Sequence, residues 1–82
     1  MKVVLLPQAQ EDLDAVFEPL LSEIVRRLQG LKEFPELGAH MGGPFAGYRS
    51  TVVGAFRIVY HALPRGVIEV AYIRDCRRKP LS

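Results

Sequence analysis

The sequence lacks most features that mark secreted proteins, membrane proteins and the common enzyme classes. Its single cysteine, Cys76, excludes an internal disulfide framework and suits a reducing compartment. No apolar run approaches the ~20 residues of a membrane helix, and the apolar stretch at the N-terminus is too short for a signal peptide. A glycine-rich phosphate loop, a Cys-x-x-Cys pair and a His-x-x-x-His pair are all missing, so we expect no cofactor and no metal site. These absences predict a cytoplasmic protein that does not enter a membrane.

The composition is that of a small globular protein. Hydrophobic residues make up 49% of the chain and charged residues 24%, which excludes a disordered chain. Its 82 residues leave no room for a second core, so residues 1–82 are expected to form one domain.

Positive charge is concentrated in the second half of the chain. Residues 1–36 carry four basic and seven acidic side chains, a balance of −3, whereas residues 37–82 carry seven basic and two acidic ones, a balance of +5. Such asymmetry suggests that one surface meets an anionic partner.

The first half of the chain predicts one strand and two helices. Lys2–Leu6 is a β-branched and leucine run closed by a proline, which is typical of a strand. Apolar residues then fall at helical spacing up to residue 34, and Pro19 divides them into helices over about 8–17 and 19–33. Residues 37–45, with three glycines and a proline, are expected to form a loop.

Three apolar-rich runs in the second half predict an antiparallel meander over 48–53, 55–63 and 67–73. The segment Leu63-Pro64-Arg65-Gly66 matches a type I turn that ends in a left-handed glycine. That turn places the following pairs opposite one another: Leu63 and Val67, His61 and Glu69, Arg57 and Ile73.

Alternation along the strands sorts the side chains onto two faces. The face expected to rest on the helices carries Phe56, Ile58, Tyr60, Ile68, Val70 and Tyr72. The other face carries Arg57, Val59, His61, Val67, Glu69, Ala71 and Ile73. A bulged loop around Gly54 would add Tyr48 and Val52 to the core and Arg49 and Thr51 to the open face. A strict two-residue turn would reverse this and bury Arg49, so the bulged loop is preferred. The result is an α+β domain of order β-α-α-β-β-β, with an antiparallel sheet packed on a two-helix hairpin.

Arginine is the residue type most suited to carry the function. Arg57 stands in the middle of an apolar strand, where an unused charge would cost free energy. Guanidinium groups bind phosphate oxygens in pairs and stay charged. A phosphate site is therefore predicted from the residues Arg49, Thr51, Arg57, Arg74, Arg77, Arg78 and Lys79.

The strand motifs resemble the RelE/ParE superfamily of toxins from bacterial type II toxin–antitoxin systems. The resemblance rests on Gly47-Tyr48-Arg49, Gly54-Ala55-Phe56-Arg57-Ile58-Val59-Tyr60, Ile68-Glu69-Val70-Ala71-Tyr72-Ile73 and Gln8-Ala9-Gln10-Glu11-Asp12-Leu13. It implies a plasmid-stabilisation type of toxin with a cognate antitoxin, whose acidic or helical segment is expected on the open sheet face and the basic cleft.

In the RelE branch the resemblance implies a ribosome-dependent endoribonuclease that binds RNA, cuts mRNA without a metal and inhibits translation. By position, Arg57 matches the arginine at the scissile phosphate, while Arg77 and Arg49 match other basic residues of the catalytic set. Thr51 stands where many relatives have lysine, and the sequence ends at Ser82 without a C-terminal helix or its tyrosine or histidine. Two alternatives follow: a ParE-like inhibitor of DNA gyrase without chemistry of its own, or an inactive family member.

Overall fold

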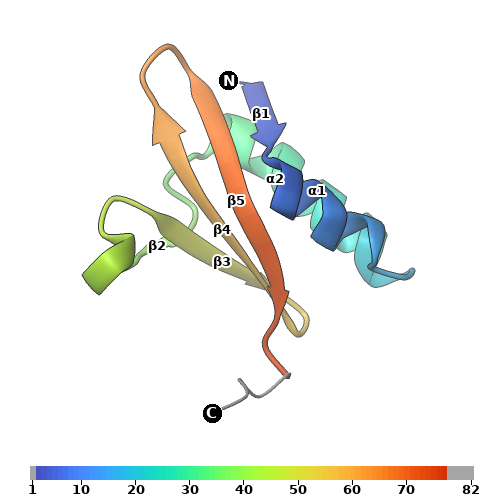
Figure 1. Ribbon diagram of the computed structural model, residues 1–82. Helices are drawn as coiled ribbons and strands as arrows, with labels where there is room; N and C mark the ends of the chain where they lie inside the picture. The colour runs from blue at the N-terminus through green and yellow to red at the C-terminus, as the bar shows by residue number, and fades with distance from the viewer. Residues whose placement is uncertain (1, 78–82) are drawn as a thin grey trace.

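The computed structural model describes residues 2–77 as a five-stranded mixed sheet with two helices on one face (Figure 1). In chain order the elements are β1 (Lys2–Leu5), α1 (Pro7–Asp14), α2 (Leu20–Glu33), β2 (Ala39–His40), the 3-10 helix η1 (Gly43–Phe45), β3 (Arg49–Val53), β4 (Phe56–Leu63) and β5 (Val67–Asp75). The strand order is β1-β5-β4-β3-β2, with β1 parallel to β5 and the other neighbours antiparallel. The predicted α+β class and order are confirmed. The parallel β1 makes the sheet mixed, and the expected loop over 37–45 contains β2 and η1.

Prolines and apolar spacing explain the helices. Pro7 occupies the first turn of α1, where its missing N–H costs nothing, and Pro19 immediately precedes α2. In α2, Ile24, Leu28 and Leu31 lie on one side at helical spacing and are buried. This stripe faces the sheet. Neither helix within residues 2–77 has the length and hydrophobicity of a membrane-spanning segment.

The core lies between the helices and the sheet, as alternation predicted for most positions. Ile58, Tyr60, Ile68 and Val70 are completely buried and pack in one cluster with the α2 stripe. Phe56 is partly buried against that cluster.

The β4–β5 turn sets the register close to it. Leu63 pairs with Val67 and His61 with Glu69, which confirms both predicted pairs. The turn type differs from the prediction. Arg65 has φ 75° and Gly66 has φ 73°. In the predicted type I turn Arg65 would be the second central residue, which has a negative φ.

A bulge then corrects the expected faces of β5. Ala71 has no partner on β4, so the register shifts by one residue, and Arg57 pairs with Arg74 instead of Ile73. Side chains beyond a bulge point to the other face. Tyr72 therefore lies on the face away from the helices, and Ile73 takes its place in the core with 4% of its surface exposed.

The β3–β4 hairpin also differs from the prediction. It turns through two residues, with Gly54 at φ 58°, and not through a bulged loop. Arg49 and Thr51 consequently lie on the helix side of the sheet, because they pair with residues of β4 that face the helices. Tyr48 and Val52 lie on the opposite side, outside the core.

The face away from the helices is not fully open. Phe45 of η1 makes edge-on ring contacts with Tyr48 and Tyr72, with centroids 6.3 and 6.2 Å apart. Val59 is completely buried although it points away from the helices. The segment around η1 therefore covers part of the surface that was expected to be bare.

Candidate functional site

Arg57 and Arg74 form a pair of cations on the sheet face away from the helices. They stand directly opposite one another on β4 and β5, and both are exposed. The Arg74 guanidinium lies 5.0 Å from the centroid of the Tyr72 ring. No carboxylate within residues 2–77 forms an ion pair with either arginine. Because like charges opposite one another in a sheet are destabilising, a bound anion would relieve this pair.

Arg77 lies just beyond β5 and is held by its own neighbour. Its Nη2 and Nε donate to Asp75 at 2.9 and 3.1 Å, and its main-chain N–H donates to the same carboxylate at 2.9 Å. The hydrogen bond to Asp75, reinforced by the charge of that carboxylate, raises the pKa of Arg77 above its usual value. The structure therefore shows Arg77 in an ion pair, not directed at Arg57.

Arg49 lies on the other side of the sheet from Arg57. Its Nη1 donates to the Gly38 carbonyl at 2.8 Å and more weakly to the Glu36 carbonyl at 3.4 Å, and its Nη2 is 3.1 Å from His40 Nε2. Burial was expected to be too costly for this arginine. It is tolerated because the chain entering β2 passes over the half-buried guanidinium with its carbonyl oxygens turned inward.

Thr51 is buried, with 7% of its surface exposed, and its Oγ1 accepts a hydrogen bond from Arg27 Nη1. The sequence alone did not point to Arg27 or to this contact. A signal was present, because Arg27 lies next to Leu28 and three residues after Ile24, at the flank of the buried stripe of α2.

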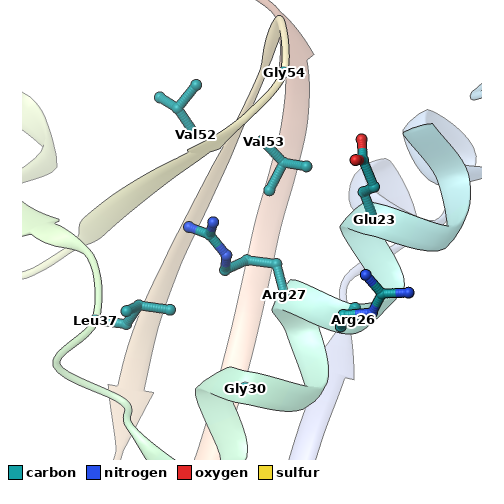
Figure 2. A pocket seen from close by; sticks show the side chains of 8 residues that line it. All are labelled: Glu23, Arg26, Arg27, Gly30, Leu37, Val52, Val53 and Gly54. Carbon is teal, nitrogen blue, oxygen red and sulfur yellow. The ribbon is translucent and has the colours of Figure 1, made fainter. Parts of the chain in front are cut away.

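Arg27 also lines a hollow of about 360 Å³ between α2 and β3. Figure 2 shows its side chain extending from α2 across the gap toward the strand. The remaining lining residues are Glu23, Arg26, Gly30, Leu37, Val52, Val53 and Gly54.

An aromatic stack lies near the other end of β4. The rings of Tyr48 and His61 are parallel within 12° at 4.4 Å, and His61 Nε2 lies 2.7 Å from Glu69 Oε1. The predicted cross-strand pair of His61 and Glu69 is thus present. Its half-buried position and its stacking are those of a structural contact.

The predicted phosphate residues do not converge on one point. Arg57 and Arg74 share a face, Arg49 and Thr51 lie across the sheet, and Arg77 is paired. The two remaining candidates, Arg78 and Lys79, lie outside the described residues. Within residues 2–77 no group of histidine, cysteine and carboxylate side chains could hold a metal ion.

Comparison with solved structures identifies the fold. The toxin–antitoxin complex RelBE2 from Mycobacterium tuberculosis contains a chain similar to this one, with TM-score 0.82 and 19% identity over 90% of this chain and 95% of that one. The intact RelBE toxin–antitoxin complex of E. coli gives TM-score 0.78 and 16% identity over 94% and 98% of the two chains. The isolated RelE toxin of E. coli gives TM-score 0.79 and 15% identity over 96% and 87%.

Comparison by sequence identifies the family. No curated protein matches the chain significantly. The family model for the ParE toxin of the type II toxin–antitoxin system, parDE, matches residues 3–80. The chain therefore belongs to the ParE toxin family of type II toxin–antitoxin systems, within the RelE/ParE superfamily that its strand motifs resemble.

Proposed function

We propose that this chain, as a single domain, is a toxin that acts by binding a protein target, DNA gyrase, and that a cognate antitoxin neutralises it. The match to the ParE family over residues 3–80 supports this activity over RNA cleavage. The structure adds a physical reason, which is the separation of the candidate catalytic residues.

The observation that carries the proposal is that, within residues 2–77, no histidine lies beside the arginine pair. Attack of a ribose 2′-hydroxyl on the adjacent phosphate needs a base and an acid at the reacting atoms. His61 lies four residues from Arg57 along β4, which is roughly 13 Å of strand, and it is bound to Glu69. The other histidine of the chain, His40, contacts Arg49. Within residues 2–77 the pair thus offers charge without a histidine to move protons.

One observation favours the second candidate, a ribosome-dependent mRNA endoribonuclease. Arg57 and Arg74 are exposed on one face, and Tyr72 lies under the Arg74 guanidinium. Paired guanidinium groups suit the oxygens of a scissile phosphate, and a tyrosine ring can stack on a base. On this reading the partners are the ribosome and mRNA.

Two measurements separate the candidates. The first maps mRNA 5′ ends in cells after induction of the toxin, and the second measures DNA supercoiling by gyrase in the presence of purified toxin. We expect inhibited supercoiling with intact mRNA. Codon-phased mRNA cuts that disappear in Arg57→Ala and Arg74→Ala would instead establish the ribonuclease. Arg65→Gly is the matched control, because it removes an exposed arginine in the turn beyond the far end of β4, and glycine accepts its positive φ.

A protein antitoxin is the second part of the proposal. It is supported by the family and by the two similar structures that are complexes of a toxin with its antitoxin. The excess of +5 in residues 37–82 favours an acidic partner. Coexpression with the product of the neighbouring gene is expected to restore growth. Continued growth arrest with every candidate partner would contradict the proposal that a protein antitoxin neutralises this toxin.

A further inference from the structure

We propose that the turn between α1 and α2, which presents Phe17 among carboxylates, is the surface through which the toxin docks on a cationic region of DNA gyrase. This inference rests on the proposed function, because it requires that gyrase is the target. It assigns the target to the acidic half of the chain and the antitoxin to the basic half.

Phe17 is exposed to an unusual degree for its size. Of the exposed large hydrophobic side chains within residues 2–77, it has the largest accessible fraction, 86%. The preceding residue, Val16, has 7% of its surface exposed and belongs to the core cluster. The ring of Phe17 therefore adds almost nothing to the core. Its burial against a partner would remove a large apolar surface from water and stabilise the complex.

The turn holds Phe17 in place before any partner arrives. The Leu21 N–H donates to the Phe17 carbonyl at 3.2 Å. The carboxylate of Glu18 accepts hydrogen bonds from the N–H and the Oγ of Ser22, at 2.9 and 2.8 Å. A side chain presented by an ordered turn loses less conformational entropy on binding than one on an unstructured loop, which favours tight docking.

The charge around the turn has a single sign. Residues 3–25 carry five acidic side chains and no basic one. Three of the five, Glu11, Asp14 and Glu18, are exposed, and none of them forms an ion pair within residues 2–77. An exposed ring beside uncompensated carboxylates is complementary to an apolar pocket that is bordered by cations.

Of the two partners in the proposed function, gyrase matches this chemistry better than the antitoxin does. An enzyme that holds a DNA duplex carries lysine and arginine side chains that neutralise the phosphates. The antitoxin is expected to be acidic, because it meets the excess of +5 in residues 37–82. The carboxylates of the turn would repel such a partner, and they would also repel the same turn of a second copy.

The turn is accessible to a large protein. In Figure 1 it lies at the free end of the helix pair, on the opposite side of the view from β2 and η1. Shortly before this end α1 is fastened to the sheet, because Asp12 Oδ2 accepts the Ile73 N–H at 2.9 Å. Gyrase can therefore reach Phe17 without displacing an element of the toxin.

Binding of purified gyrase to the wild-type toxin and to Phe17→Ser tests the anchor. Loss of the ring is expected to weaken gyrase binding about tenfold or more, as truncation of an aromatic anchor at an interface does. Inhibition of supercoiling should weaken by the same factor, while binding of the neutralising gene product stays unchanged. Phe34→Ser is the matched control, because it makes the same replacement at a 64% exposed phenylalanine just after the C-terminal end of α2. It is expected to change gyrase binding less than about twofold.

A second pair of variants tests the charge. Asp14→Asn keeps the shape of the side chain and removes its charge, so its association rate with gyrase at low salt should fall about twofold or more. The difference from wild type should disappear at high salt, which screens the attraction. Glu33→Gln removes the same charge at the exposed last residue of α2 and is expected to leave the rate unchanged.

Inhibition by the wild-type toxin is measured first, so that the inference and the proposed function fail separately. If the wild type does not bind gyrase, the proposed function itself fails. If it does and Phe17→Ser binds equally well, or if Phe34→Ser loses as much, gyrase docks elsewhere and the proposed function stands. If Phe17→Ser loses the antitoxin and keeps gyrase, the turn belongs to the antitoxin. If the toxin alone self-associates and Phe17→Ser does not, a second copy covers the ring.

Discussion

Replacing Tyr60 by phenylalanine should destabilise the protein although the ring itself is kept. Tyr60 is completely buried on β4, and its hydroxyl makes two hydrogen bonds. It donates to the Pro35 carbonyl at 2.9 Å and accepts from the Gly38 N–H at 2.8 Å. These bonds fix the chain between α2 and β2 against the sheet.

The magnitude follows from the groups left behind. Tyr60→Phe leaves one N–H and one C=O without their partner, and each such group costs about 1–1.5 kcal/mol where water cannot replace it. The free energy of unfolding should therefore fall by about 2–3 kcal/mol. In a chain of 82 residues this lowers Tm by roughly 8–24 °C.

Urea denaturation followed by circular dichroism measures this loss. Tyr72→Phe is the control, because the Tyr72 hydroxyl makes no hydrogen bond to residues 2–77 and its removal should change the stability by less than about 0.5 kcal/mol. If Tyr60→Phe is as stable as the wild type, or if both variants lose the same amount, the hydroxyl does not anchor this segment and the reasoning is refuted.

Three further substitutions test other contacts by the same unfolding assay. Gly30→Ala should raise the unfolding free energy by about 1 kcal/mol, because its Cβ meets open space and alanine is the better helix former. Gly38→Ala should lower it by about 2 kcal/mol or more, since its Cβ would lie 2.7 Å from the Tyr60 hydroxyl; equal effects of the two glycine variants would contradict the packing described. Asp12→Ala should cost about 1.5–3 kcal/mol, because Asp12 Oδ2 accepts the Ile73 N–H at 2.9 Å and links α1 to β5. Unchanged exchange of the Ile73 amide in Asp12→Ala would show that this link is dispensable.

The separation of Arg49 from Arg57 bears on how this toxin could act. Both arginines were expected on one phosphate-binding face, where they would share one anion. The two-residue turn at Gly54 puts them on opposite sides of the sheet. One ligand on the Arg57 face is therefore beyond the direct reach of Arg49, whose guanidinium is bound by main-chain carbonyls. This favours a binding surface over a convergent catalytic centre.

Local signals in the sequence determined the elements and the family. Pro7 and Pro19 mark the helix starts, because proline is tolerated at or just before the first turn of a helix and is costly in its interior. Alternation of apolar residues gave β4 and the first half of β5, and the turn after Leu63 set the register as far as the His61–Glu69 pair. The aromatic-Arg-Ile-Val-Tyr strand was sufficient to point to the RelE/ParE superfamily, which the family match confirms.

Only the tertiary structure decided which side chains share a face. Strand side chains alternate with a period of two, so one residue more or less in a turn or bulge moves every later side chain across the sheet. The bulge at Ala71 exchanged Tyr72 for Ile73 in the core, and the tight hairpin moved Arg49 to the helix side. Arg49 is stable there because carbonyls of a segment more than ten residues away satisfy its guanidinium. The sequence thus supplied the arginines, and contacts between distant segments determined which of them can act together.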